Sequence, residues 1–281
     1  MTETRRFSED PGPGTRLVVA REYREEVLSL GLRGPGALEA LLAAGSPQPG
    51  GRAGVWHVVL PESGRVLHVR VFAHGGWMRR LTGRRLFRLA RPLAELEATA
   101  HLRARGVAVP APAFVLGERA GPTWRAALAT ALEPDTVSGG RFLASAPSPR
   151  VLTRAARAAG RAVRALHDAG ARHADLHVDN LLVAVRPNDA PRVVITDLDR
   201  ARIVGAVDDA RRMAELMRLH RSLVKRGLDP GVRAHAAFLA AYTGPDRPLR
   251  AGLLRHLPHE HARLRRHALL YRKPPERRLP G

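Results

Sequence analysis

The stretch HADLHVDN at residues 173–180, followed by ITDLD at 195–199, decides the fold of this 281-residue chain. Asp175 and Asn180 stand at the two ends of a D-x-x-x-x-N spacing, and Asp197 comes directly after the apolar run RVVIT. The segments LLVAV and RVVITD read as two short strands between these residues. Ser148 and Gly170 are typical start and stop residues for the apolar-striped helix that precedes the loop. We therefore expect the three polar residues to meet in one site.

These residue types suit phosphoryl transfer, which needs a carboxylate near the attacking hydroxyl and oxygen ligands for magnesium. We predict Asp175 and His173 as catalytic residues and Asn180 and Asp197 as metal ligands, because the spacing is typical of the protein-kinase-like fold. His177 stands where protein kinases usually carry lysine, and TDLD replaces DFG. A protein acceptor is therefore disfavoured, and a sugar or other small molecule is favoured.

Two alternative interpretations compete for the same residues. His173, Asp175 and His177 could be metal ligands of a zinc hydrolase, but this interpretation leaves Asn180 and the ITDLD strand unexplained. Asp175 and Asp197 could instead be loop carboxylates that cap helices. The phosphoryl-transfer interpretation explains the helix, the loop and both strands together.

The order of predicted elements favours an α+β, bilobal protein-kinase-like fold. Its N-lobe is an antiparallel sheet with one helix, and its C-lobe is mainly helical. VWHVVL and RVLHVRVF flank PESG as a β-hairpin, a helix follows Pro92, and EPD at 133–135 interrupts the pattern between the lobes. We predict a partly structured N-terminal extension (1–49), the N-lobe (50–134), the C-lobe (135–250) and a basic C-terminal tail (251–281).

The first 224 residues contain no lysine, although the kinase pattern expects one on the third strand, paired to a glutamate on the next helix. Arg70 is the only well-placed cation, and Glu95 is its expected partner. The alternative is a surface arginine and a solvated glutamate, since Glu97 lies beside Glu95.

Three further residues complete the predicted nucleotide site. Gly51 and Gly54 belong to GGRAG, which stands where a phosphate-covering loop is expected, but the segment lacks G-x-G-x-x-G and could be the end of a linker. Glu133, at the lobe boundary, is expected to mark the segment that contacts adenine.

The composition points to anionic partners, because 47 basic residues stand against 26 acidic ones and the formal charge is +21. Only Lys225 and Lys273 are lysines, and the other basic residues are arginines. There are no cysteines, which excludes disulfides and thiolate metal sites. No apolar run is long enough for a membrane span or signal peptide, so we expect a cytoplasmic protein.

The sequence resembles the lipopolysaccharide kinase family, in particular its 3-deoxy-D-manno-octulosonic acid (Kdo) kinases. The matching stretches include GRAGVWHVVL, AELEATAHLRARGVAVPAP, HADLHVDNLLV, ITDLDRARI and RRMAELMRLHRSLVKRG, and they cover roughly residues 50–228. The family is similar in placing arginine where protein kinases use lysine, which matches Arg70. Its loop often reads HADLNxHN, so His177 and Asp179 are departures in a part of the loop expected to face the acceptor.

The resemblance implies a kinase that uses ATP and Mg2+ to phosphorylate Kdo on a lipid A precursor. Such a substrate would place the chain as a peripheral protein on the anionic cytoplasmic face of the inner membrane. Arg79, Arg80, Arg84, Arg85 and Arg88, with Trp77 and Phe87, form a candidate membrane contact or, alternatively, a solvated helix face.

Other functions remain open from the sequence. The acceptor could be a core heptose, an aminoglycoside or another small alcohol. The chain could also be a pseudokinase or a basic nucleic-acid-binding module, but stacking aromatics are few, at 4% of residues, so no nucleic-acid partner is expected.

Overall fold

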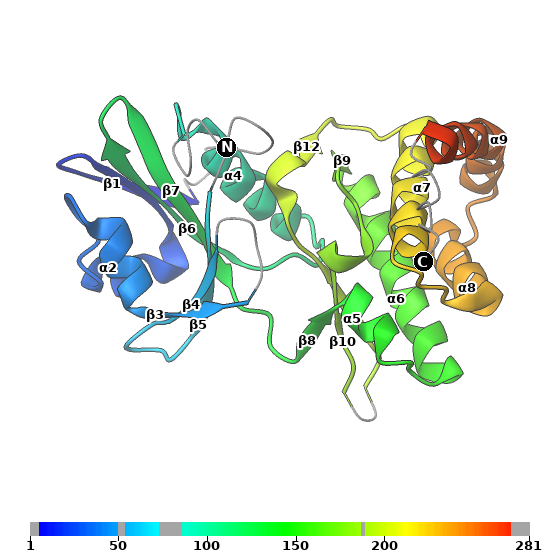
Figure 1. Cartoon of the computed structure of the whole chain (residues 1–281), viewed down its shortest axis with the longest axis horizontal. Helices are drawn as coiled ribbons and strands as arrows, with labels where there is room; N and C mark the ends of the chain where they lie inside the picture. Colours follow the sequence, from blue (N-terminus) through cyan, green and yellow to red (C-terminus); the bar gives the residue numbers. More distant parts are fainter. Residues whose placement is uncertain (1–5, 50–53, 73–85, 187–188, 271–281) are drawn as a thin grey trace, which may run out of the picture.

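The protein folds into two lobes in a computed structural model that describes residues 6–49, 54–72, 86–186 and 189–270 (Figure 1). The N-lobe is an antiparallel sheet with the strand order β1-β2-β6-β7-β5-β4-β3. Its strands are β1 (Phe7–Gly12), β2 (Thr15–Ala20), β3 (Gly45–Gln48), β4 (Val55–Val59), β5 (Val66–Val71), β6 (Pro112–Ala120) and β7 (Thr123–Ala131). The predicted hairpin is confirmed as β4 and β5, and the α+β class is confirmed with it.

Helices cover both faces of this sheet, because alternate residues along each strand point to opposite sides. The short helices α1 (Arg24–Ser29) and α2 (Ala37–Ala43) share one buried cluster with Leu67 and Val69 of β5. Helix α4 (Ala90–Ala104) lies on the opposite face. The side chains that alternate with Leu67 and Val69 along β5 are therefore directed toward α4. The N-lobe therefore has more helices than the single one predicted.

The segment predicted as an N-terminal extension is part of the N-lobe sheet. β1 and β2 form a hairpin that pairs with β6, and β3 pairs with β4 at the other edge. Leu17 and Val19 on β2 are buried in the same cluster as the central strands. The sheet thus begins at residue 7 rather than after residue 50.

The C-lobe is mainly helical, as predicted, with two small sheets beside the helices (Figure 1). Its helices are α5 (Gly139–Ala144), α6 (Pro149–Asp168), α7 (Asp209–Lys225), α8 (Gly231–Thr243) and α9 (Arg247–Leu270). One sheet contains β8 (Thr136–Ser138), β10 (Leu181–Ala184) and β11 (Arg192–Ile195), and the other contains β9 (Ala171–Arg172) and β12 (Arg202–Ile203). The segment predicted as a basic tail contains most of α9.

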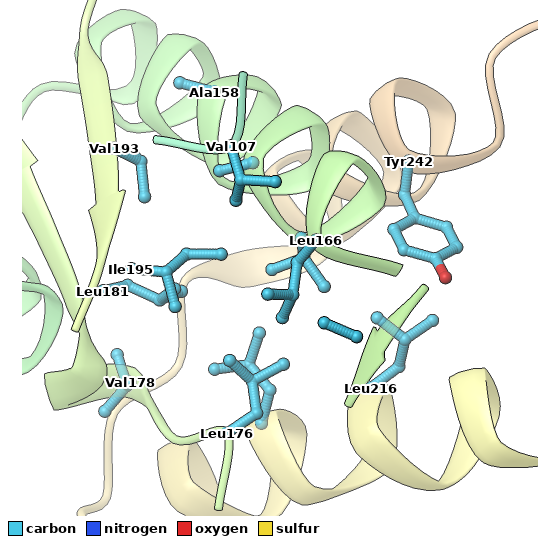
Figure 2. Close-up of a cluster of buried hydrophobic side chains, with 14 of the residues drawn as sticks. Val107, Ala158, Leu166, Leu176, Val178, Leu181, Val193, Ile195, Leu216 and Tyr242 are labelled. Atoms are coloured by element: carbon cyan, nitrogen blue, oxygen red, sulfur yellow. The ribbon is translucent and has the colours of Figure 1, made fainter. Parts of the chain in front are cut away.

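The core of the C-lobe lies directly behind the HADLHVDN loop. Figure 2 shows Leu176 and Val178 of the loop directed into a cluster that also contains Leu166 of α6 and Leu216 of α7. Helices α6 and α8 approach closely at Gly160, where an added Cβ atom would stand 2.3 Å from the carbonyl oxygen of Phe238. The loop is therefore anchored on a packed core by its apolar side chains. No helix among the described residues is both long enough and apolar enough to cross a bilayer.

Candidate functional site

A cleft of about 230 Å3 between the two lobes brings together four of the predicted site residues. Arg70 reaches it from β5, Glu95 from α4 and Glu133 from the segment after β7, while Asp197 lies on the C-lobe side. Leu128, Ala131, Leu132, Leu182 and Leu198 add apolar surface to its walls. A cleft with apolar walls and a few charged groups has the character of a small-ligand site.

Arg70 links the two lobes through two carboxylates. Its Nη1 donates to Oδ1 of Asp197 at 3.2 Å, and its Nη2 forms a short ion pair with Oε2 of Glu95. The pairing depends on the alternation of β5, which points Arg70 toward α4 while its neighbours Val69 and Val71 are buried. Glu97, the alternative partner, is exposed on α4.

Glu95 is almost fully buried, with 5% of its surface exposed. Burial raises its pKa to about 7, because the loss of solvent outweighs the lowering effect of Arg70. The carboxylates of Asp199 and Asp197 contribute to this rise. The charge of Glu95, and with it the strength of the ion pair to Arg70, therefore changes near neutral pH.

A second ion pair between the lobes was not foreseen from the sequence. Arg91, in the first turn of α4, donates from Nε and Nη2 to the two carboxylate oxygens of Asp199. Burial alone would raise the pKa of Asp199, but the hydrogen bonds and charge of Arg91 hold this pKa below its usual range. The guanidinium groups of Arg70 and Arg91 both lie over the ring of Phe72, at 4.7 and 5.5 Å from its centre. The pair fixes α4 against the segment that carries Asp197.

The HADLHVDN loop presents Asp175 to solvent and holds Asn180 inward. The Asp175 side chain is 49% exposed, whereas Asn180 is buried and its Nδ2 donates to the Asp175 carbonyl at 3.1 Å. The Thr196 amide donates to the Asn180 carbonyl at 2.9 Å, next to Asp197. Both Ala174 and Asp197 have the left-handed backbone conformation, with φ of 61° and 58°, which non-glycine residues seldom adopt. The loop at Ala174 and the segment after β11 at Asp197 thus both have uncommon backbone conformations, and a hydrogen bond joins the two segments.

Glu215 of α7 holds the strained part of the loop, and the sequence reasoning missed it. Its carboxylate accepts from the amides of His173 and Ala174 at 3.0 and 2.8 Å, and it lies 3.2 Å from Nε2 of His167. Burial raises the pKa of Glu215, but these hydrogen bonds outweigh it and bring the pKa below its usual range. An acidic residue among Met213, Leu216 and Met217 on the buried face of a predicted helix was the available signal.

Ser222 of α7 and Arg226, which follows the helix, make further contacts along the loop. The Val178 amide donates to Oγ of Ser222 at 2.9 Å, and Arg226 forms a short ion pair with Asp179. Ser138 also donates to Asp179, at 3.3 Å. The carboxylate of Asp179 thus attaches the loop to the rest of the C-lobe, and the expectation that this part of the loop faces the acceptor stays a prediction.

His173, which was predicted as catalytic, lies behind the loop and contacts the segment that carries Asp197. It is fully buried, its Nε2 lies 2.9 Å from the Thr196 carbonyl, and burial lowers its pKa. No group of three histidine, aspartate or glutamate side chains that could hold a metal ion occurs in the described part of the chain. The zinc interpretation of the HxDxH pattern thus finds no ligand set there.

The other predicted residues take varied positions. Glu133 lines the cleft, but its carboxylate accepts from Arg192 at 2.7 Å. Gly54 has a φ of 98° just before β4, so it has the backbone freedom expected of a phosphate-covering loop. Gly51, and Trp77, Arg79, Arg80, Arg84 and Arg85 of the basic cluster, lie outside the described residues. His68, which no pattern singled out, lines the cleft, and burial together with His57 and Arg70 lowers its pKa to about 4.

Comparisons with known proteins agree with this geometry. A profile of the lipopolysaccharide kinase (Kdo/WaaP) family matches residues 44–242. The 3-deoxy-D-manno-octulosonic acid kinase of Vibrio cholerae serotype O1 is 28% identical over 194 residues, which cover 66% of this chain and 78% of that protein. The solved structure of WaaP in complex with acyl carrier protein matches with a TM-score of 0.62 and 23% identity, covering 92% of this chain and all of the matched one. That structural likeness supports the fold.

Proposed function

Because the chain belongs to the lipopolysaccharide kinase (Kdo/WaaP) family, we propose that it transfers the γ-phosphate of ATP to a hydroxyl of Kdo on a lipid A precursor. Family membership makes it a lipopolysaccharide kinase with a sugar hydroxyl as acceptor. The observation that carries the proposal is the meeting of Arg70, Glu95 and Asp197 at one cleft. A pseudokinase or a nucleic-acid-binding module is not favoured.

The cleft residues fit a nucleotide. Leu128, Ala131 and Leu182 offer apolar surface for a purine, and Glu133 lies at the segment expected to run beside it. Arg70 stands at the charged end of the cleft, where a guanidinium can pair with the phosphates that are not transferred. Arg91 and Asp199 hold α4 in place, so that Glu95 keeps Arg70 directed into the cleft.

The oxygen donors beside the cleft fit magnesium, which prefers carboxylate and amide oxygens. Asp197 is 44% exposed and offers a carboxylate. Asn180 uses its Nδ2 for the Asp175 carbonyl, an arrangement that leaves its Oδ1 for a ligand. A bound magnesium ion would neutralise charge on the phosphates, and Asn180 and Asp197 would be the residues that hold it.

Asp175 is the proposed catalytic base. Its carboxylate is half exposed at the tip of the loop, so an acceptor hydroxyl can approach it and donate its proton to it as the phosphorus–oxygen bond forms. Glu215 keeps the preceding residues, His173 and Ala174, in the conformation that presents this carboxylate.

An acceptor panel tests the choice of sugar. Purified protein with ATP and magnesium would be offered a Kdo–lipid A precursor, a lipopolysaccharide core containing heptose, and an aminoglycoside. ADP release would measure turnover, and mass spectrometry would locate the new phosphate. We expect phosphate on Kdo, whereas exclusive phosphorylation of heptose or of the aminoglycoside would contradict the assignment.

We also propose peripheral association with the anionic cytoplasmic face of the inner membrane. The formal charge of +21 and the membrane-borne acceptor support it. Arg88 and Phe87, the described members of the basic cluster, are both exposed, and 62% of the Phe87 surface is accessible.

An acyl carrier protein is the second partner we propose, on the basis of the WaaP complex and of a cavity in the C-lobe. The cavity has a volume of about 590 Å3 and lies among α5, α6, α7, α8 and α9, with Leu152, Met217 and Phe238 in its wall. Its lining suits a fatty acyl chain. Size-exclusion chromatography should show a complex with acyl carrier protein that carries an acyl chain, and weaker binding after Ala156→Phe, which reduces the cavity. Equal binding of the protein without the acyl chain would contradict the role of the cavity.

A further inference from the structure

Helix α7 and its C-cap residue Arg226 direct four side chains toward the HADLHVDN loop, at positions separated by three or four residues. Three of them, Glu215, Ser222 and Arg226, are occupied by hydrogen bonds or ion pairs with the loop. The fourth, Arg218, faces Asp175, and the distance from its Nη1 to Oδ1 of Asp175 is 3.9 Å. This distance is that of a long ion pair and exceeds that of a hydrogen bond, so the guanidinium stands beside the proposed base without a hydrogen bond to it.

The donors of Arg218 are largely unused in the described structure. Its Nε is buried and has no hydrogen-bond acceptor among the described residues. Its side chain is 37% exposed, so a ligand can reach the guanidinium from solvent. A buried N–H group without a partner is unfavourable, and an anion placed there would satisfy it.

Two more arginines extend the positive charge away from Asp175. Arg221 lies one turn after Arg218 on α7, and Arg263 comes from α9. Burial lowers the pKa of Arg221, and the nearby charges of Arg263 and Arg218 lower it as well. Glu260, 3.5 Å from Arg263, and Asp175, 3.9 Å from Arg218, offset part of this charge. The row therefore carries an excess of positive charge beside the proposed base.

We infer that Arg218, supported by Arg221 and Arg263, forms a binding site for an anionic group of the acceptor, a carboxylate or a phosphate. The inference rests on the proposed function, in which Asp175 receives the proton of the acceptor hydroxyl. An anion held by the Arg218 fork would place the acceptor against the loop, and it would draw the guanidinium away from Asp175. The carboxylate would then be free to accept the hydroxyl.

Steady-state kinetics with the full chain test this site. Arg218→Gln, Arg218→Lys and Arg263→Gln would be compared with Arg24→Gln, an exposed arginine on α1 of the N-lobe. We expect Arg218→Gln to raise the KM for the Kdo–lipid A precursor roughly tenfold or more, because a charge-assisted hydrogen bond is lost. The KM for ATP should stay unchanged, Arg218→Lys should bind better than Arg218→Gln, and Arg24→Gln should resemble the wild type.

The outcomes separate this inference from the proposed function. No phosphorylation of the precursor by the wild type would contradict the proposed function itself. An active wild type with an unchanged acceptor KM in Arg218→Gln would contradict the anion site alone. A loss confined to kcat would also overturn it, because Arg218 would then only position Asp175. An unchanged KM for ATP shows that the variant is folded.

Two modified acceptors identify the anion. A precursor without its phosphates and one with the Kdo carboxylate esterified would be given to the wild type and to Arg218→Gln. The acceptor that lacks the contacted group should show no difference in KM between the two proteins. A difference that persists with both modified acceptors would exclude an anion as the contact.

Discussion

Arg70 contacts two carboxylates from opposite lobes with two different nitrogens, Asp197 through Nη1 and Glu95 through Nη2. Lysine carries the same charge as a single ammonium group and cannot reproduce this fork. We expect Arg70→Lys to lower kcat/KM for ATP roughly tenfold or more, because a charged hydrogen bond is lost. Kinetics at varied ATP would measure it, with Arg24→Gln as the control, and full activity of Arg70→Lys would show that charge alone suffices.

Glu95 makes the stability of the protein depend on pH. Its pKa rises on folding from 4.5 to about 7, so between these values the folded state binds more protons than the unfolded state. This contribution to stability is complete below pH 4.5 and is lost as pH rises through 7. The difference amounts to about 3 kcal/mol.

Glu95→Gln should remove this contribution because glutamine does not titrate. We expect the free energy of unfolding of the variant, measured by denaturant titration from pH 5 to pH 8, to change less with pH than that of the wild type. Glu97→Gln, on the exposed side of α4, is the matched control. Identical pH profiles for the wild type and Glu95→Gln would contradict the shifted pKa.

At the residue scale, the motifs predicted Arg70, Glu95, Asp175, Asn180 and Asp197 as site residues, and the structure brings Arg70, Glu95 and Asp197 to one cleft. The contacts between Arg70, Glu95 and Asp197 link residues far apart in the chain, and only the resemblance to known kinases made them predictable. Asp199 with Arg91, and His68 in the cleft wall, were not predicted. Nothing in their local pattern separates a partner in an ion pair, or a cleft residue, from an ordinary polar side chain.

Helix α7 supports the loop by a row of contacts rather than by one residue. Glu215→Ala would leave the amides of His173 and Ala174 without their acceptor in a buried place. We expect the free energy of unfolding to fall by about 3 kcal/mol or more, since each unsatisfied buried donor is costly. The free energy of unfolding, measured by denaturant titration, and kcat would both decrease.

Ser222→Ala is the matched control for that change, because it removes one neutral hydrogen bond to the same loop. Its expected cost is about 1 kcal/mol. If Glu215→Ala were no more destabilising than Ser222→Ala, the strained conformation of Ala174 would not depend on Glu215.

The sequence predicted the elements with strong patterns and missed the weak ones. The hairpin of β4 and β5, the helices α4, α6 and α7, and the strands β10 and β11 follow clear apolar periodicity. β1 contains FSEDPG and β3 contains GSPQ, and both sequences have low strand propensity. They form strands at the edges of the sheet, where such residues are tolerated. Their membership in the N-lobe comes from pairing with β2 and β4, which no local pattern shows.

At the scale of the whole molecule, the formal charge of +21 should govern binding to membranes. Each basic residue near an anionic surface contributes about 1 kcal/mol. The protein should therefore sediment with vesicles that contain anionic lipid and be released at about 0.5 M salt, where screening is strong. Vesicles of zwitterionic lipid are the control, and equal binding to both kinds would contradict an electrostatic association.

The proposed function is phosphoryl transfer at the cleft between the two lobes, with Asp175 as the base. The most direct test is the transfer of label from γ-labelled ATP to a Kdo–lipid A precursor by the wild type and by Asp175→Asn. Because the Asp175 side chain is half exposed, the variant should fold, which its thermal unfolding would verify. We predict labelled lipid with the wild type and at least about a 100-fold lower rate with Asp175→Asn. Equal rates, or no label on the lipid with the wild type, would contradict the account.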